Sequence, residues 1–199
     1  ELKEKHMEFV FFSADTNQNK ENKEKAREYV MQLLNSAENE CLICDPYFKK
    51  EDFEKYIFFM EKLDVKVRII NSEKQLGNIS APDSEDYLLK LNDCINYYNR
   101  KVGREVAECR SLTKNLSIHD RFIIIDDCGW LIGSLLNEFG NRASSICKIP
   151  QGSLEYMRKN FERWWNDTEN SESLDGYIQR KVKLNASPEG KLLKHITHL

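Results

Sequence analysis

The sequence has little of what marks disordered or membrane-embedded chains. Of its 199 residues only 8 are glycine and 4 are proline, whereas 40% are hydrophobic and 11% aromatic. A chain of this size and composition can bury one sizeable core. It lacks an opening signal segment and any apolar run near the roughly 20 residues that cross a bilayer. We therefore expect a folded cytoplasmic protein with no membrane partner.

An excess of positive charge is also missing. The formal net charge is -3 at pH 7, and the isoelectric point is about 5.9. This balance argues against a protein that coats nucleic acid through bulk electrostatics, but it permits a local basic site. Lys114 and Arg142 lie near the motif described below and are candidate phosphate or nucleic-acid contacts. A solvated charged face explains these two residues equally well.

The cysteines and histidines form no pattern typical of a metal site. Without a secretory signal, the six cysteines are expected to be reduced core thiols. Cys41 and Cys44 make one C-x-x-C pair, but neither a second pair nor suitably spaced histidines accompany it. We therefore expect no metal and no cofactor, and a metal or redox role for this pair is the minor alternative.

Hydrophobic patterning predicts strands and helices in alternation. Short apolar runs predict strands at residues 8–13, 40–44, 65–70, 105–112, 118–126, 130–133 and 143–149. Apolar residues three to four positions apart predict helices at residues 23–37, 52–63, 84–101 and 153–167. This alternation favours an α/β sandwich with a mostly parallel central sheet flanked by helices. Residues 168–199 are more polar and are expected to form a linker and a C-terminal tail or appended helix.

One segment carries regularly spaced polar residues. Residues 117–147 read SIHDRFIIIDDCGWLIGSLLNEFGNRASSIC and contain the pattern H-x-R-x4-D-x6-G-S-x-x-N. Because side chains alternate along a strand, His119 and Arg121 are expected to face one pocket. Phe122 and Ile124 would then point the other way, into the core.

This spacing resembles the phospholipase D superfamily, whose members carry H-x-K-x4-D followed by Gly-Ser and Asn. Bacterial members that read His-Asp-Arg-Phe are similar, and the strand end at residues 44–48 and the helix with Trp164 and Trp165 also match them. The resemblance covers about residues 8–167. It implies a phospholipase D-like sandwich for residues 1–167.

The resemblance also implies roles for the motif residues. His119 would attack phosphorus to form a phosphohistidine, and Arg121 would stabilise charge on the phosphate oxygens. Ser134 and Asn137 would add neutral donors to the same phosphate. Structural roles are implied for two further residues, Asp126, which would accept backbone hydrogen bonds, and Gly133.

The mechanism of the family needs two histidines that face each other across the phosphate. This chain has one motif and no internal repeat, so we expect a homodimer that brings two copies of His119 together through the motif face. The other histidines, His6, His195 and His198, lie outside the motif.

Three departures from the family pattern bear on activity. Arginine replaces the usual lysine at position 121, and Asn137 lies three residues after the serine instead of two. The acid that orients the histidine in many of these nucleases corresponds to Ser144 or Ser145. Glu138 or Glu108 could take the place of that acid.

Three functions follow from this resemblance. The first is a metal-independent phosphodiesterase, a nuclease acting on nucleic acid, with a possible place among effectors of bacterial defence. The second is a catalytically weakened domain used for dimerisation or for binding a phosphate ligand or nucleic acid. The third is phospholipase or phospholipid synthase activity, whose enzymes usually carry two motifs in one chain.

Overall fold

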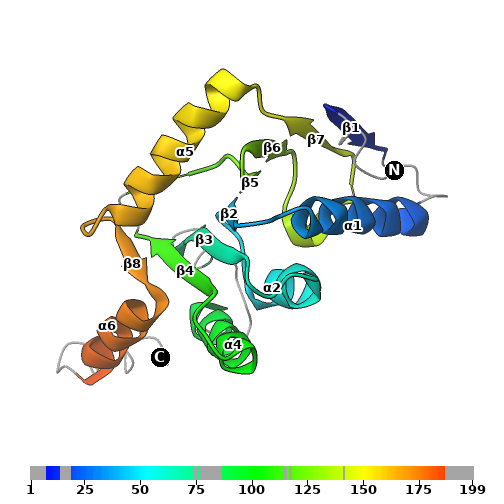
Figure 1. Cartoon of the computed structure of the whole chain (residues 1–199). Coiled ribbons are helices and arrows are strands. Elements are labelled where there is room, and N and C mark those ends of the chain that lie inside the picture. The colour runs from blue at the N-terminus through cyan, green and yellow to red at the C-terminus, as the bar shows by residue number, and fades with distance from the viewer. Residues whose placement is uncertain are drawn as a thin grey trace, which may run out of the picture.

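The computed structural model describes residues 8–13, 19–73, 76, 87–113, 116, 118–140 and 142–186. An eight-stranded sheet runs in the order β1-β7-β6-β5-β2-β3-β4-β8 (Figure 1). The strands are β1 (Phe9–Phe12), β2 (Glu40–Cys44), β3 (Lys66–Ser72), β4 (Ala107–Leu112), β5 (Phe122–Ile125), β6 (Cys128–Ile132), β7 (Ser144–Lys148) and β8 (Ser171–Ser173). The helices are α1 (Asn19–Asn35), α2 (Lys50–Tyr56), α4 (Tyr87–Val102), α5 (Gln151–Asn166) and α6 (Leu174–Ala186), with short 3-10 turns η1 (Ile57–Phe59) and η2 (Leu136–Glu138).

The expected α/β architecture is confirmed, but the expectation of a mostly parallel sheet is wrong. Only β2, β3 and β4 run parallel to one another, and the other five neighbouring pairs are antiparallel. The alternation of strands and helices ends after β4, and β5, β6 and β7 follow one another without a crossover helix. Strands joined in this way pair antiparallel, because a parallel connection needs a long crossover. The sheet is therefore mixed and mostly antiparallel.

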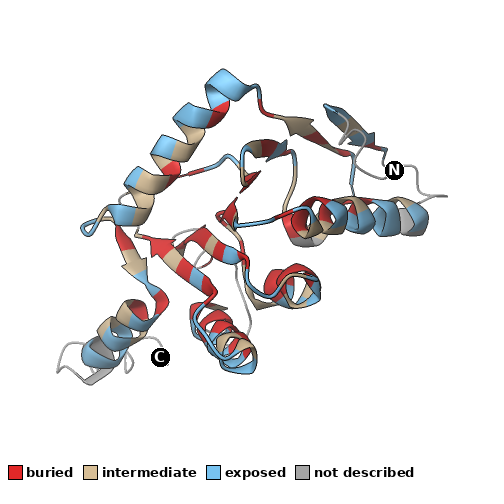
Figure 2. Ribbon diagram, viewed as in Figure 1, coloured by how far each residue is buried: buried red, intermediate tan, exposed pale blue. Residues whose placement is uncertain are grey.

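Two apolar cores lie on the two faces of the sheet. Helices α1, α2 and α4 cover one face, where Ile43, Ile69 and Ile123 belong to the larger core. Helix α5 covers part of the other face, where Phe122 and Phe161 belong to the smaller core. In Figure 2 buried residues line the sides of α1, α2 and α4 that face the sheet, and exposed residues line their outer sides. This is the amphipathic pattern that the sequence predicted.

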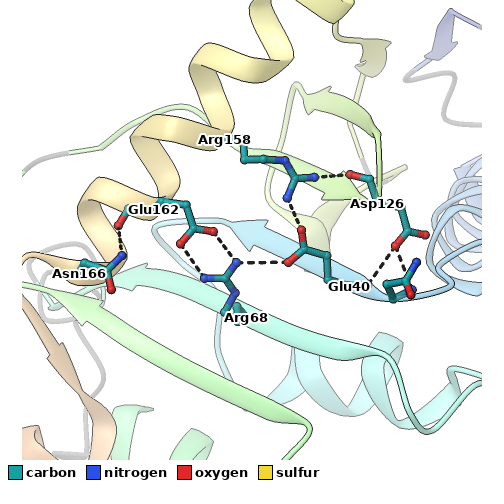
Figure 3. A network of polar contacts seen from close by, with 7 residues as sticks. Glu40, Arg68, Asp126, Arg158, Glu162 and Asn166 are labelled. Carbon is teal, nitrogen blue, oxygen red and sulfur yellow. Dashed lines mark hydrogen bonds and ion pairs between the residues drawn. The ribbon is translucent and has the colours of Figure 1, made fainter.

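Helix α5 is also held to the sheet by charged side chains, which we call the α5 network: Glu40, Arg68, Arg158 and Glu162. Arg68 donates two hydrogen bonds to the Glu162 carboxylate, at 2.8 and 2.5 Å, and one to Glu40 at 3.2 Å. Arg158 donates to Glu40 and to the backbone carbonyl of Asp126 (Figure 3). A bidentate arginine–carboxylate pair has a defined geometry, so the network fixes how α5 lies on β2 and β3.

The segment after Thr168, expected as a linker with a tail or appended helix, supplies β8 and α6. Strand β8 pairs antiparallel with β4 at one edge of the sheet. Leu174 and Tyr177 of α6 are buried in the larger core beside α4. Residues 187–199 lie outside the described part of the chain.

The six cysteines are all free thiols; four of them are buried as expected, whereas Cys128 and Cys147 are only partly buried. Cys41 belongs to the larger core and Cys44 to the smaller one, so their side chains lie on opposite faces of the sheet. Burial raises the pKa of both thiols. This arrangement leaves no shared metal or redox site for the pair. Among the described residues, no helix is long and apolar enough to cross a membrane.

Candidate active site

The beginning of β5 lies at the same edge of the sheet as the ends of the parallel strands. Cys44, the last residue of β2, pairs with Phe122, the first residue of β5. The antiparallel direction of β5 therefore places Arg121 beside Asp45. If β5 were parallel to β2, the motif would lie at the opposite edge of the sheet.

Four polar residues on neighbouring strands form a row at this edge, which we call the edge row: Arg121, Asp45, Asn71 and Ser111. The paired positions Cys44, Ile70 and Arg110 precede Asp45, Asn71 and Ser111 on the three parallel strands. Each member of the edge row lies two positions from a residue of the larger core, so alternation places the row on the α2 and α4 face.

Three of the four residues of the edge row are buried, and the row is only partly paired. Asp45, Asn71 and Ser111 are at most 2% exposed. Among the described residues, no hydrogen bond reaches Asn71 Oδ1, Ser111 Oγ or Arg121 Nε. Asn71 donates its amide to the Phe48 carbonyl at 3.1 Å. Buried polar atoms without a partner cost stability, and they occur where a ligand, water or function requires them.

Arg121 is held from two directions. Its Nε lies 3.6 Å from Asp45 Oδ1, which makes an ion pair without a hydrogen bond. Its guanidinium carbon lies 5.4 Å from the centre of the Tyr47 ring, the distance of a cation–π contact. The side chain is 21% exposed, so part of the guanidinium reaches the surface.

His119 is exposed and lies two positions before Arg121, in the segment before β5, because the strand predicted from residue 118 begins only at Phe122. The alternation expected for this segment is found in the strand itself. Phe122 and Ile124 are buried in the core under α5, whereas Ile123 and Ile125 belong to the larger core. The motif histidine is thus exposed just before β5, two positions from an arginine that pairs with the buried Asp45.

The Gly-Ser-x-x-Asn stretch follows β6. Gly133 donates its N–H to the Ser145 carbonyl at 2.9 Å, and a Cβ atom there would lie 3.2 and 3.3 Å from the backbone N and O of Ser145. Glycine is therefore favoured at this close approach of β7. Ser134 Oγ has a long contact of 3.4 Å with the Leu135 carbonyl. Asn137 lies in η2, and its side chain is outside what the structure describes.

Asp126 lies at the far end of β5 from Arg121, in the hairpin turn. Its carboxylate accepts backbone hydrogen bonds from Glu38, Asn39 and Glu40 at 2.7, 2.9 and 3.0 Å. Partial burial opposes ionisation, but these three bonds outweigh it and hold the pKa of Asp126 below its ordinary value. Asp126 also has a positive φ of 44°. It ties the β5–β6 turn to the segment before β2, away from the edge row.

Two buried acids lie at the site edge. Burial raises the pKa of Asp45, although the N–H groups of Tyr47 and Leu136 and the charge of Arg121 lower it in part. Burial and the nearby charge of Asp45 raise the pKa of Asp52 to about 7. Asp52 accepts the Lys49 N–H at 3.0 Å, and its Oδ1 has no partner among the described residues.

The other candidate acids lie elsewhere. Ser144 and Ser145 lie on β7, at the position that corresponds to the histidine-orienting acid of many nucleases in the family. Ser144 Oγ is buried without a hydrogen-bond partner among the described residues. Glu108 lies three residues before Ser111 on β4 and lines a cavity beside α4 and β8. Glu138 is half-buried in η2.

Sequence reasoning gave Asp45 no role in the site, although it counted residues 44–48 as a strand end that matches the family. Its signal was an acid directly after an apolar run, but its meaning depended on which strand lies alongside. Of the candidate basic contacts, Arg142 is exposed next to β7, and Lys114 lies outside the described residues. In the described part of the chain, no group of three or more His, Cys, Asp or Glu side chains could hold a metal ion.

Comparison with known proteins identifies the family. A family model described as cardiolipin synthase, PLD-like domain, matches residues 30–145, more than half of the chain and all of the segment from His119 to Asn137. The chain belongs to the phospholipase D superfamily. No curated protein matches the sequence.

Solved structures show the same phospholipase D-like fold. NucT from Helicobacter pylori is 14% identical with a TM-score of 0.53, and the match covers 83% of this chain and 98% of that one. The phospholipase D family member Nuc from Salmonella typhimurium is 19% identical with a TM-score of 0.52, covering 74% and 90%. Phosphatidylserine synthase from Haemophilus influenzae is 19% identical with a TM-score of 0.57, covering 96% of this chain but only 45% of that one.

Proposed function

We propose that this phospholipase D-like domain is a metal-independent phosphodiesterase that acts on nucleic acid through a phosphohistidine on His119. The observation that carries this proposal is the exposed His119 just before β5, two residues from an arginine whose guanidinium is held by Asp45 and Tyr47. An imidazole for attack and a fixed cation for the phosphate oxygens are what such a transfer requires.

The reaction has two steps. A ring nitrogen of His119 attacks phosphorus, the bond from phosphorus to the leaving oxygen breaks, and a second imidazole gives that oxygen its proton. The second imidazole then takes a proton from water, whose oxygen displaces the His119 nitrogen. Arg121 stabilises negative charge on the non-bridging oxygens in both steps.

The second imidazole comes from another copy of the chain in this proposal. Within one chain, the motif supplies a single histidine. A two-fold homodimer through the motif face places His119 of each copy on either side of one phosphate. The match to NucT and Nuc over 98% and 90% of their lengths supports an arrangement with one motif per chain.

The first test is His119→Ala in a cleavage assay on DNA and RNA with excess EDTA. We expect the wild type to cleave and the variant to lose activity by at least about 1,000-fold. His195→Ala, which changes a histidine outside the motif, is the matched control and should keep wild-type activity. Cleavage that survives His119→Ala, or that needs a divalent cation, rejects the proposal.

The second test addresses the shared site. If each dimer has one site built from two copies of His119, a mixed dimer of wild type and His119→Ala is inactive. After equal amounts are unfolded and refolded together, activity should be about one quarter of that of wild type at the same total concentration, rather than about one half. A value of one half, or a monomer by light scattering, contradicts the homodimeric site.

A second function is supported by a specific observation. Ser144 and Ser145 stand where many nucleases of this superfamily carry the acid that orients the histidine. The domain would then bind a phosphate ligand or nucleic acid without turnover and serve in dimerisation. Binding that weakens steeply with salt, without cleavage of any phosphodiester, supports this alternative. We further propose the cytoplasm as the location and bacterial defence as the setting of the nuclease.

A further inference from the structure

Asp45 contacts three separate parts of the site. Its Oδ1 accepts the N–H of Tyr47 at 2.9 Å, and its Oδ2 accepts the N–H of Leu136 at 3.3 Å. Its Oδ1 also lies 3.6 Å from Arg121 Nε. The carboxylate therefore joins the start of β5, the loop after β2 and the η2 loop that follows Gly133 and Ser134. It is 1% exposed, so it does not meet substrate directly.

We propose that Asp45 is the positioning residue of this site: it holds Arg121 and the η2 loop in one geometry and offsets the charge of the arginine before substrate binds. This inference rests on the proposed phosphodiesterase function. It assigns to a residue outside the H-x-R-x4-D motif a role that acts through Arg121 and not on the reacting atoms.

Geometry supports an effect on orientation. Arginine has several rotatable bonds and many possible ways to meet a phosphate, and fixing one of them lowers the cost of reaching the transition state. Asp45 lies on the Nε side of the guanidinium, and the guanidinium carbon lies over the ring of Tyr47. These two contacts leave the terminal nitrogens as the donors for phosphate oxygens. A loosely held arginine would bind the anion in several poses, only some of which are productive.

The charge of Asp45 should favour turnover through orientation but weaken the binding of phosphate by Arg121. A buried carboxylate next to a cation weakens the attraction of that cation for a further anion. Loss of the Asp45 charge should therefore strengthen the binding of phosphate in the ground state while it slows turnover. A role in folding alone predicts a different result, since a damaged site would lose both affinity and turnover.

The test uses Asp45→Asn, which keeps a carbonyl oxygen for a backbone N–H but removes the charge. Asp52→Asn is the matched control, because it neutralises the other buried acid of this edge, which has no described contact with Arg121. The probes are bis(p-nitrophenyl) phosphate for kcat and KM, and inorganic phosphate for calorimetric binding. We expect Asp45→Asn to lower kcat about 10- to 100-fold while KM and the phosphate Kd fall about 3- to 10-fold. Asp52→Asn should change these values less than about 3-fold.

A double-mutant cycle keeps the test valid if Asp45→Asn folds poorly. Arg121→Gln removes the partner, so adding Asp45→Asn to it relieves the unpaired charge and should cost no further kcat or phosphate affinity. The inference is overturned if Asp45→Asn is as active as wild type, if its kcat and phosphate affinity fall together, or if it costs as much in the Arg121→Gln background as alone.

Failure of the proposed phosphodiesterase function can be distinguished from failure of the proposed role of Asp45. A wild-type protein that binds phosphate but does not turn over any diester rejects the proposed phosphodiesterase function. The double-mutant cycle, measured by the Kd for phosphate, still tests the role of Asp45. A tighter Kd in Asp45→Asn that disappears in the Arg121→Gln background supports the inference in that case. A wild type that neither binds phosphate nor cleaves a diester overturns both proposals.

Discussion

The two charged regions at opposite ends of β2 and β5 are built in different ways. In the α5 network every charged side chain contacts one of opposite sign, and Arg68 makes a bidentate pair with Glu162. In the edge row, Arg121 Nε, Asn71 Oδ1 and Ser111 Oγ are buried without hydrogen bonds among the described residues. Arg68 Nε of the α5 network is also buried without a hydrogen bond among the described residues, but the terminal nitrogens of Arg68 bond to two carboxylates, whereas Arg121 has only a 3.6 Å ion pair with Asp45. The α5 network therefore has the pairing of a structural contact, and the edge row, which carries the motif arginine, does not. The comparison predicts that changes at one end affect mainly stability and changes at the other mainly function.

The largest effect is expected from Arg121→Gln. It removes the cation proposed for the phosphate oxygens, so kcat/KM for bis(p-nitrophenyl) phosphate should fall by at least about 100-fold. The change removes a buried unpaired Nε but leaves the buried Asp45 carboxylate without its cation; because that carboxylate keeps two backbone N–H bonds, the melting temperature should fall only slightly. A large drop in melting temperature would show that the edge row is a structural contact after all.

Asp126→Ala should have the largest effect on stability. It removes the acceptor of three backbone hydrogen bonds, so the free energy of unfolding at pH 7 should fall by about 2–3 kcal/mol in urea titrations. The pKa of Asp126 is lowered in the folded state, so its contribution is present above the unfolded pKa of about 3.9 and is lost as the pH falls through the folded value. An equal loss of stability at pH 3 and pH 7 would contradict this account.

Asp52→Asn should make the protein more stable, in a way that depends on pH. The pKa of Asp52 is raised to about 7 in the folded state, so the folded protein binds the proton more tightly and the wild type loses stability as the pH rises from about 4 to 7. The variant has no such loss, and it should exceed the wild type by about 1–2 kcal/mol at pH 8.5 but by little at pH 4. Unfolding curves that show the same difference at both pH values would exclude ionisation of Asp52 as the cause.

The smallest effect is expected at the margin of the α5 network. Glu162→Gln breaks the bidentate pair with Arg68, but the Glu162 side chain is 38% exposed and solvent screens the pair. The free energy of unfolding should fall by about 1 kcal/mol or less, with kcat/KM unchanged. A loss of turnover without a loss of stability would mean that the two ends of the sheet are coupled.

Most helices and strands could be predicted from local sequence, but the residues at which they begin and end could not. Residues 40–44 were predicted and found as a strand, and the helix predicted at residues 153–167 is α5, at residues 151–166. The predicted helix at residues 52–63 is instead α2 and the 3-10 turn η1, which together end at Phe59. The strands predicted at residues 118–126 and 130–133 are found as β5 and β6, but the turn between them is Asp126–Asp127 instead of the residues 127–129 that the prediction left between the two strands. Element ends depend on backbone bonds to distant segments, such as those of Asp126 to residues 38–40, which periodicity does not contain.

The sequence alone determined the resemblance to the family, the motif with His119 and Arg121, and most of the segments that form strands or helices, but not β8. These features depend on residue spacing and on apolar periodicity, which are properties of short stretches. The tertiary structure decided the direction of β5, and with it the edge at which the motif lies. Strand direction depends on pairing between residues far apart in the chain. For that reason the contact of Asp45 with Arg121, 76 positions away, was visible only in the folded protein.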